Sequence, residues 1–192
     1  MPVLEWVSAT ASPLGLVFLA EMGDKSQLVC MTLAARHRHW PVLLGATAAF
    51  LLLNTLAVVF GARLAQWVPE RLLAALVAVL FAVFGILSLR AEEEDGVESV
   101  EEHPGHGIFI TAFLMIFLAE MGDKTQIAVA GMASTLPPVP VWTGASLALF
   151  FTSALGVIAG RKLLARIPLH RLHQISGVFF LLLAAFALSK VF

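Results

Sequence analysis

Phe18-Leu-Ala-Glu-Met-Gly-Asp-Lys-Ser-Gln27 and Phe117-Leu-Ala-Glu-Met-Gly-Asp-Lys-Thr-Gln126 are two nearly identical stretches that decide how the chain is organised. Each contains two carboxylates, one lysine and one amide inside an apolar segment long enough to cross a bilayer. An ionisable side chain in the middle of a membrane costs about 3 kcal/mol or more, and such residues usually have a function. The two stretches therefore predict a functional site within the membrane.

The composition is that of an integral membrane protein. Of the 192 residues, 59% are hydrophobic and only 13% are charged, and the mean hydropathy is +0.91. At about 20 apolar residues per crossing, the chain has room for roughly six transmembrane helices with short loops. The formal net charge of -1 gives no reason to expect nucleic acid as a partner. The single cysteine, Cys30, excludes an intramolecular disulfide.

Six apolar runs, separated by charged or proline-containing segments, predict six helices. We expect them at residues 10–35, 42–62, 72–89, 108–133, 141–159 and 172–188. The intervening residues 91–107 differ from the rest because they are strongly acidic and contain two histidines, His103 and His106. We therefore predict an all-α membrane protein with a first three-helix repeat at residues 1–90, an acidic linker at 91–107 and a second repeat at 108–192.

The two halves match one another at a single offset of 99 residues. This offset relates the two charged motifs, and it also relates four other pairs: Pro41 and Pro140, Gly45 and Gly144, Gly61 and Gly160, and Pro69 and Pro168. Such a register indicates internal duplication. Because each repeat has an odd number of crossings, the second would enter the membrane from the opposite side. We therefore expect inverted repeats, the plan of many secondary transporters.

The positive charges of the loops predict the orientation. One side of the predicted assembly carries seven basic residues, which are Arg36, Arg38, Arg90, Arg161, Lys162, Arg166 and Arg171. The other side carries only Arg63, Arg71 and Lys190. The positive-inside rule places the first side in the cytoplasm. Both termini would then lie outside and the acidic linker inside.

Within each motif, the spacing would bring charged groups together. On a continuous helix, Glu21, Asp24 and Lys25 share one face because they are three and four residues apart. Gly23 and Gly122 are unfavourable inside a helix, and their repetition suggests close approach or local unwinding. Inversion would bring the two motifs face to face in the middle of the bilayer.

The resulting site would be rich in oxygen ligands. Four carboxylates and two ammonium groups leave a charge of -2, which one divalent cation or two protons would neutralise. Oxygen ligands suit Mn²⁺, Ca²⁺ or Mg²⁺. The predicted metal ligands are Glu21, Asp24, Gln27, Glu120, Asp123 and Gln126, with Met22, Met121, Ser26 and Thr125 as possible additions. Lys25 and Lys124 would couple the metal to protons, whereas Asn54 and Ser153 would form hydrogen bonds between packed helices.

The doubled sequence Glu21-Met-Gly-Asp-Lys-Ser26 and Glu120-Met-Gly-Asp-Lys-Thr125 resembles the signature of the Ca²⁺/Mn²⁺:H⁺ antiporter family, the Gdt-type membrane cation exchangers. The resemblance extends to six helices, two inverted halves and an acidic central loop. It implies that Ca²⁺ or Mn²⁺ moves against protons, with Glu21, Asp24, Glu120 and Asp123 as metal ligands. Bacterial members resemble manganese exporters, so the expected function is Mn²⁺ export across a bacterial inner membrane. The cation would be the substrate, and no cofactor is expected.

Two other functions remain possible from the sequence. A passive divalent cation channel would use the same carboxylates, and coupling to protons cannot be deduced from a sequence. An intramembrane aspartyl protease would need two aspartates on different helices, here Asp24 and Asp123, sharing a proton. Lys25 and Lys124 argue against the protease because neighbouring ammonium groups favour ionisation of both aspartates.

Overall fold

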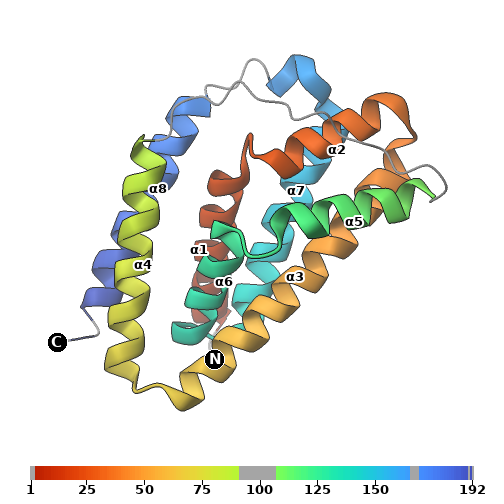
Figure 1. The fold of residues 1–192 in the computed structure, drawn as a ribbon. Helices are drawn as coiled ribbons and strands as arrows, with labels where there is room; N and C mark the ends of the chain where they lie inside the picture. The colour runs from red at the N-terminus through yellow and green to blue at the C-terminus, as the bar shows by residue number, and fades with distance from the viewer. Residues whose placement is uncertain (1–2, 91–106, 165–168, 190, 192) are drawn as a thin grey trace.

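The computed structural model describes residues 3–90, 107–164, 169–189 and 191, and within these residues every regular element is a helix. Figure 1 shows how the helices are arranged. In chain order they are α1 (Val3–Glu21), α2 (Lys25–Arg36), α3 (His39–Trp67), α4 (Glu70–Arg90), α5 (Ile108–Glu120), α6 (Lys124–Thr135), α7 (Pro138–Leu164) and α8 (Leu169–Leu188). Residues 91–106 of the predicted acidic linker lie outside the described residues.

Two of the predicted helices are each divided in two. The predictions of continuous helices at residues 10–35 and 108–133 are wrong, because the chain leaves the helical conformation between α1 and α2 and again between α5 and α6. Gly23 has a φ of 86° and Gly122 a φ of 83°, in the left-handed region where residues with a Cβ are strained. Both glycines therefore lie where the helix is interrupted in this structure.

Prolines help to fix where several helices begin. Pro41 lies in the first turn of α3, and Pro138 and Pro140 lie in the first turn of α7. Proline is tolerated there because the first N–H groups of a helix have no acceptor within it, and its fixed φ suits the helix. Pro69 immediately precedes α4 and accepts a hydrogen bond from the Leu73 N–H at 3.0 Å.

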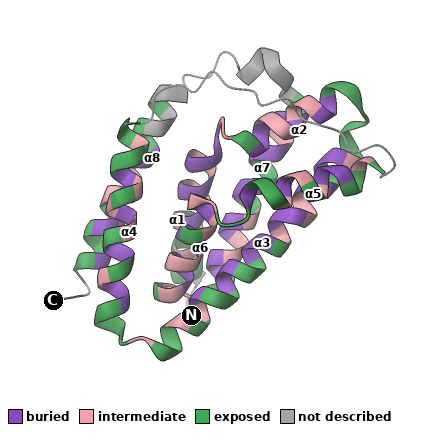
Figure 2. Cartoon of the chain, in the orientation of Figure 1, coloured by how far each residue is buried: buried purple, intermediate pink, exposed green. Residues whose placement is uncertain are grey.

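The long helices have the length and surface of membrane-spanning segments. Among the described residues, α3, α4 and residues Pro138–Ile158 of α7 are long and apolar enough to cross a bilayer. Two exposed tryptophans, Trp40 and Trp67, lie near the two ends of α3, as in the aromatic belts of membrane proteins. At about 1.5 Å per residue, this helix matches the full thickness of a bilayer with its headgroups. The outer faces of α3 and α4 are exposed along their length, although they are apolar (Figure 2). The protein is an all-α membrane protein, and the count of six spans stays a prediction.

Helices from the two halves of the chain are intermixed. The most extensive packing is between α4 and α8, between α1 and α7, and between α3 and each of α5, α6 and α7. In Figure 1, α3 and α7 run in opposite directions, and so do α4 and α8. These are the helix pairs related by the 99-residue offset, so their directions favour the inverted arrangement predicted from the sequence.

Glycines allow the closest helix contacts. A Cβ added at Gly45 in α3 would meet the backbone oxygen of Phe109 in α5, and a Cβ at Gly144 in α7 would meet the backbone oxygen of Thr10 in α1. These two glycines are 99 residues apart, and they make equivalent contacts with the first helix of the other half. Small residues of this kind let membrane helices approach until their backbones touch.

Candidate metal-binding site

Four helix ends meet around the two charged motifs. Helices α1 and α5 end at Glu21 and Glu120, whereas α2 and α6 begin just after Asp24 and Asp123, which occupy their N-cap positions. Carboxylates at N-caps interact favourably with the positive end of the helix dipole. Interrupted helices that present their ends to one place are typical of ion sites in secondary transporters.

The two motifs form the same turn with the same hydrogen bonds. The Gly23 N–H donates to Gln27 Oε1 at 2.6 Å, and the Gly122 N–H donates to Gln126 Oε1 at 2.6 Å. In both turns, the aspartate N–H also donates to the carbonyl oxygen of the preceding glutamate, at 3.1 Å in the first and 3.2 Å in the second. In this structure the predicted ligands Gln27 and Gln126 therefore brace the turns, and each amide oxygen keeps a second lone pair.

We expect the Gly122→Ala variant to be destabilised and to lose transport. A Cβ at Gly122 would meet nothing within 4 Å, so the cost is conformational and about 1–2 kcal/mol for a residue with a Cβ at this φ. The measurements are thermal unfolding in detergent and metal transport in vesicles. Gly15→Ala is the matched control, because a Cβ there also meets nothing within 4 Å and Gly15 lies within helix α1. Equal thermal midpoints for the two variants would contradict the expectation.

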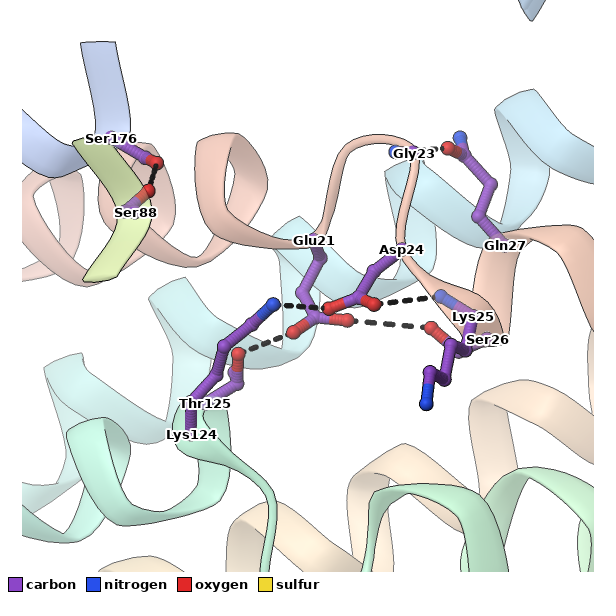
Figure 3. A network of polar contacts seen from close by, with 10 residues as sticks. All are labelled: Glu21, Gly23, Asp24, Lys25, Ser26, Gln27, Ser88, Lys124, Thr125 and Ser176. Atoms are coloured by element: carbon purple, nitrogen blue, oxygen red, sulfur yellow. Dashed lines mark hydrogen bonds and ion pairs between the residues drawn. The ribbon is translucent and has the colours of Figure 1, made fainter. Parts of the chain in front are cut away.

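Side chains from the second motif cross over to the first. Thr125 Oγ1 of the second motif donates a hydrogen bond to Glu21 Oε1 of the first. Within the first motif, Ser26 Oγ donates to Glu21 Oε2 at 3.3 Å. The Lys124 ammonium forms an ion pair with Asp24 at 2.6 Å between Nζ and Oδ2. Figure 3 shows these contacts converging on Glu21 and Asp24. The two motifs, which lie 99 residues apart in sequence, thus form one polar cluster.

Three carboxylates of this cluster are close enough to share a cation. One oxygen from each of Glu21, Asp24 and Asp123 lies within 4.8 Å of the others. Glu21 is fully buried, and Asp123 Oδ2 is a buried oxygen without a hydrogen-bond partner among the described residues. A buried polar atom without a partner is costly, so an additional positive group or proton would stabilise it. The geometry therefore suits a hard divalent cation with oxygen ligands.

The fourth predicted carboxylate, Glu120, lies beside this group. It is 6% exposed, and its carboxylate is close enough to Glu21, Asp123 and Asp24 to interact with them electrostatically. Glu120 does not belong to the set of three carboxylates whose oxygens lie within 4.8 Å of one another. The structure therefore brings all four predicted acids into one region, with three of them in the tighter group.

The two lysines and the two methionines are not equivalent. Lys25 is exposed, and its side chain extends away from Asp24 in Figure 3, so the expectation that Glu21, Asp24 and Lys25 share one helical face is wrong. The reason is that the chain is not helical between residues 21 and 25, and helical spacing does not apply there. Met22 is 4% exposed, whereas Met121 is 54% exposed.

Residues outside the motifs help to hold the cluster in place, and some of them have no recognisable signal in the sequence. Gln27 Nε2 donates to the Thr152 carbonyl oxygen in α7 at 3.0 Å and also contacts Met22 Sδ at 3.6 Å. Asn54 Nδ2 donates to Ser146 Oγ in α7 at 3.1 Å, a contact between packed helices. Ser153, its counterpart in the repeat, is 2% exposed. A carbonyl acceptor such as that of Thr152 leaves no signal in a sequence.

A separate cavity lies between α1, α4, α6 and α8. Its volume is about 660 Å³, and its polar lining comes from Ser8, Ser12, Glu70, Ser134 and Thr135. No residue of either charged motif lines it. The carboxylate cluster is therefore not part of this cavity.

The fold and the cluster define a class of protein. A helical membrane protein with interrupted helices and buried carboxylates at their ends has the features of an ion transporter. Sequence similarity to known proteins identifies the family within that class. The sequence matches the family described as "Divalent cation/proton antiporter GDT1" over residues 9–96 and 108–192, so the chain belongs to this family, and it is a transporter rather than an enzyme.

Relatives from several kingdoms match nearly the whole chain. A "Putative manganese exporter" of Vibrio cholerae is 30% identical over 186 residues, which cover 95% of this chain and 92% of the relative. GDT1-like protein sll0615 of Synechocystis is 28% identical, with coverage of 93% and 95%. GDT1-like protein 4 of Oryza sativa subsp. indica is also 28% identical, with coverage of 93% and 71%. No solved structure matches the chain.

Proposed function

We propose that this protein exports Mn²⁺ from the cytoplasm in exchange for protons. The observation that carries the proposal is the group of three carboxylates within 4.8 Å of one another, one of which has a buried oxygen without a partner among the described residues. Membership of the cation/proton antiporter family supports the exchange, and the name of the Vibrio cholerae relative supports manganese as the cation. Ca²⁺ has the same preference for oxygen ligands and is the second candidate.

The proposed ligands are the carboxylates of Glu21, Asp24, Glu120 and Asp123. Gln27 and Gln126 hold the two turns in shape and can each offer a further lone pair to the cation. The hydroxyls of Ser26 and Thr125 donate to Glu21 in this structure, and they can rotate to present an oxygen to the metal. Met22 is buried and its Sδ lies 3.6 Å from Gln27 Nε2, whereas Met121 is largely exposed.

Charge balance explains why the metal would exchange for protons. Four ionised carboxylates in a low-dielectric region are too costly to remain uncompensated, even with lysines nearby. The site would therefore alternate between a metal-loaded form and a form with about two protons, while the empty ionised form is too unfavourable to cross the membrane. The expected ratio is about two protons per Mn²⁺.

Alternating access would expose the site to one side of the membrane and then to the other. We propose six spans in two inverted repeats, with both termini outside a bacterial inner membrane and the acidic linker in the cytoplasm. Since α1 packs on α7 and α5 packs on α3, the moving bodies would each contain helices from both halves. The glycine contacts of Gly45 and Gly144 would then lie within such bodies rather than at sliding surfaces.

Purified protein in proteoliposomes tests the proposal. An inward Mn²⁺ gradient should drive protons out of the vesicles. An outward proton gradient, with the lower pH inside, should drive Mn²⁺ uptake. Because two protons compete with one cation, lowering the pH by one unit should raise the apparent KM for Mn²⁺ by up to about 100-fold, if both protons bind in that range. Mn²⁺ flux without proton movement would instead identify a passive channel.

Experiments in cells distinguish manganese from calcium as the substrate and show the direction of transport. Cells that overproduce the protein should tolerate more Mn²⁺ and contain less of it, and cells lacking it should show the reverse. Unchanged Mn²⁺ tolerance combined with altered Ca²⁺ content would contradict the proposed substrate.

A further inference from the structure

The two motif lysines have nearly identical neighbours in sequence but differ in the structure. Lys124 extends from the start of α6 to Asp24 of the other motif, with 2.6 Å between Nζ and Oδ2. Lys25, its counterpart 99 residues earlier, is exposed, and its ammonium has no ion pair among the described residues. Asp123 would be the equivalent partner for Lys25, and its Oδ2 is buried without a partner among those same residues.

The docked ammonium occupies a carboxylate that the cation also needs. Asp24 is one of the three carboxylates whose oxygens lie within 4.8 Å of one another. An ammonium and a divalent cation that contact the same carboxylate repel each other. The Lys124–Asp24 ion pair therefore disfavours a cation held by Glu21, Asp24 and Asp123, and a bound cation disfavours the ion pair.

We infer that Lys124 is a tethered counter-cation that competes with the transported cation for Asp24 in this conformation, and that Lys25 does the same at Asp123 in the opposite conformation. The inference rests on the proposed function. Its basis is that two hydrogen bonds recur in both turns, from the glycine N–H to the glutamine and from the aspartate N–H to the glutamate carbonyl, whereas the two lysines lie differently. In inverted-repeat transporters the two halves exchange their environments when the site changes sides.

This arrangement gives each lysine a role at one face of the membrane. When the cation arrives from the side that is open in this conformation, it displaces Lys124 from Asp24. After the change of conformation, Lys25 approaches Asp123 and promotes release of the cation on the other side. The lysines act as positioning residues, since they affect the metal through the carboxylates.

The test compares Lys124→Met and Lys25→Met in right-side-out and inside-out vesicles at pH 8, where protons compete least. Each variant should lower the KM for Mn²⁺ by about tenfold or more on one face and lower kcat, because the competitor for the carboxylate is missing and release is slower. The two variants should act on opposite faces. Lys124→Arg should retain the wild-type KM, because an arginine can form the same ion pair.

The outcomes separate the inference from the proposed function. Equal KM changes on both faces, changes on the same face for both variants, or unchanged KM values would overturn the inference while the wild type still exchanges Mn²⁺ for protons. Failure of the wild type to transport any divalent cation would overturn the proposed function and the inference together. A lower kcat with unchanged KM would indicate a purely structural role for the lysine and would also overturn the inference.

Discussion

The Glu21→Gln variant should lose cation exchange by at least about 100-fold while the protein still inserts and folds. Glu21 is fully buried, belongs to the three-carboxylate group and accepts hydrogen bonds from both Ser26 and Thr125. Glutamine has nearly the same shape but removes a negative charge and one anionic ligand. Removing groups that only support a metal ligand already costs about 10–100-fold, so loss of a ligand should cost at least as much.

Exchange is measured as Mn²⁺-dependent proton flux in proteoliposomes, with folding checked by thermal unfolding in detergent. Glu5→Gln is the matched control, because Glu5 is an exposed glutamate near the start of the same helix. It should transport like the wild type. Exchange by Glu21→Gln within a few-fold of the wild type would remove Glu21 from the ligand set.

The double variant Asp24→Asn with Asp123→Asn gives an independent check of the same site. It leaves Glu21 and Glu120 as the carboxylates of the cluster, and it removes two of the three carboxylates whose oxygens lie within 4.8 Å of one another. We expect neither Mn²⁺ binding nor exchange. Full activity of this double variant would contradict the proposed site.

The second large effect is expected from Gly144→Leu, which should prevent normal folding. A Cβ at Gly144 would meet the Thr10 backbone oxygen, and it would also lie 3.0 Å from the Leu14 N and 3.2 Å from the Pro13 Cβ. These are mainly backbone atoms of α1, so they cannot rotate away. Overpacking a well-packed contact costs about 1–3 kcal/mol, and the longer leucine side chain would force α1 and α7 apart.

The expected result is little folded protein for Gly144→Leu and a thermal midpoint lowered by several degrees for Gly144→Ala. Gly15→Ala serves again as the control, because its new methyl group meets nothing within 4 Å. Size-exclusion profiles and thermal unfolding in detergent provide the measurements. Normal folding and transport by Gly144→Leu would show that α1 and α7 do not pack as described.

The motifs and the 99-residue offset predicted much of the local structure. The repeated glycines indicated unwinding, and Gly23 and Gly122 do adopt positive φ values. The helix breaks themselves were not predicted, because apolar residues continue on both sides of each motif and support an uninterrupted run. The hydrophobic pattern reports burial of a segment, and it does not report whether its backbone is continuous.

The asymmetry of the site could not have been predicted. Lys25 and Lys124 have nearly identical neighbours in sequence, so no local preference distinguishes the exposed lysine from the one that reaches Asp24. The same holds for buried Met22 and exposed Met121. These differences arise from the conformation of the whole molecule, which places equivalent residues in unequal surroundings. Partners such as the Thr152 carbonyl also depend on tertiary packing alone.

The packing of α1 against α7 has a consequence for biogenesis. Helix α1 leaves the ribosome well before α7, because the helix that covers it begins at Pro138, more than 100 residues later. Until α7 is inserted, the backbone around Thr10 that Gly144 contacts has only lipid or the insertion machinery beside it. A nascent chain therefore remains incompletely assembled through most of its synthesis, and the membrane quality-control system has a long interval in which to recognise a chain that stops early.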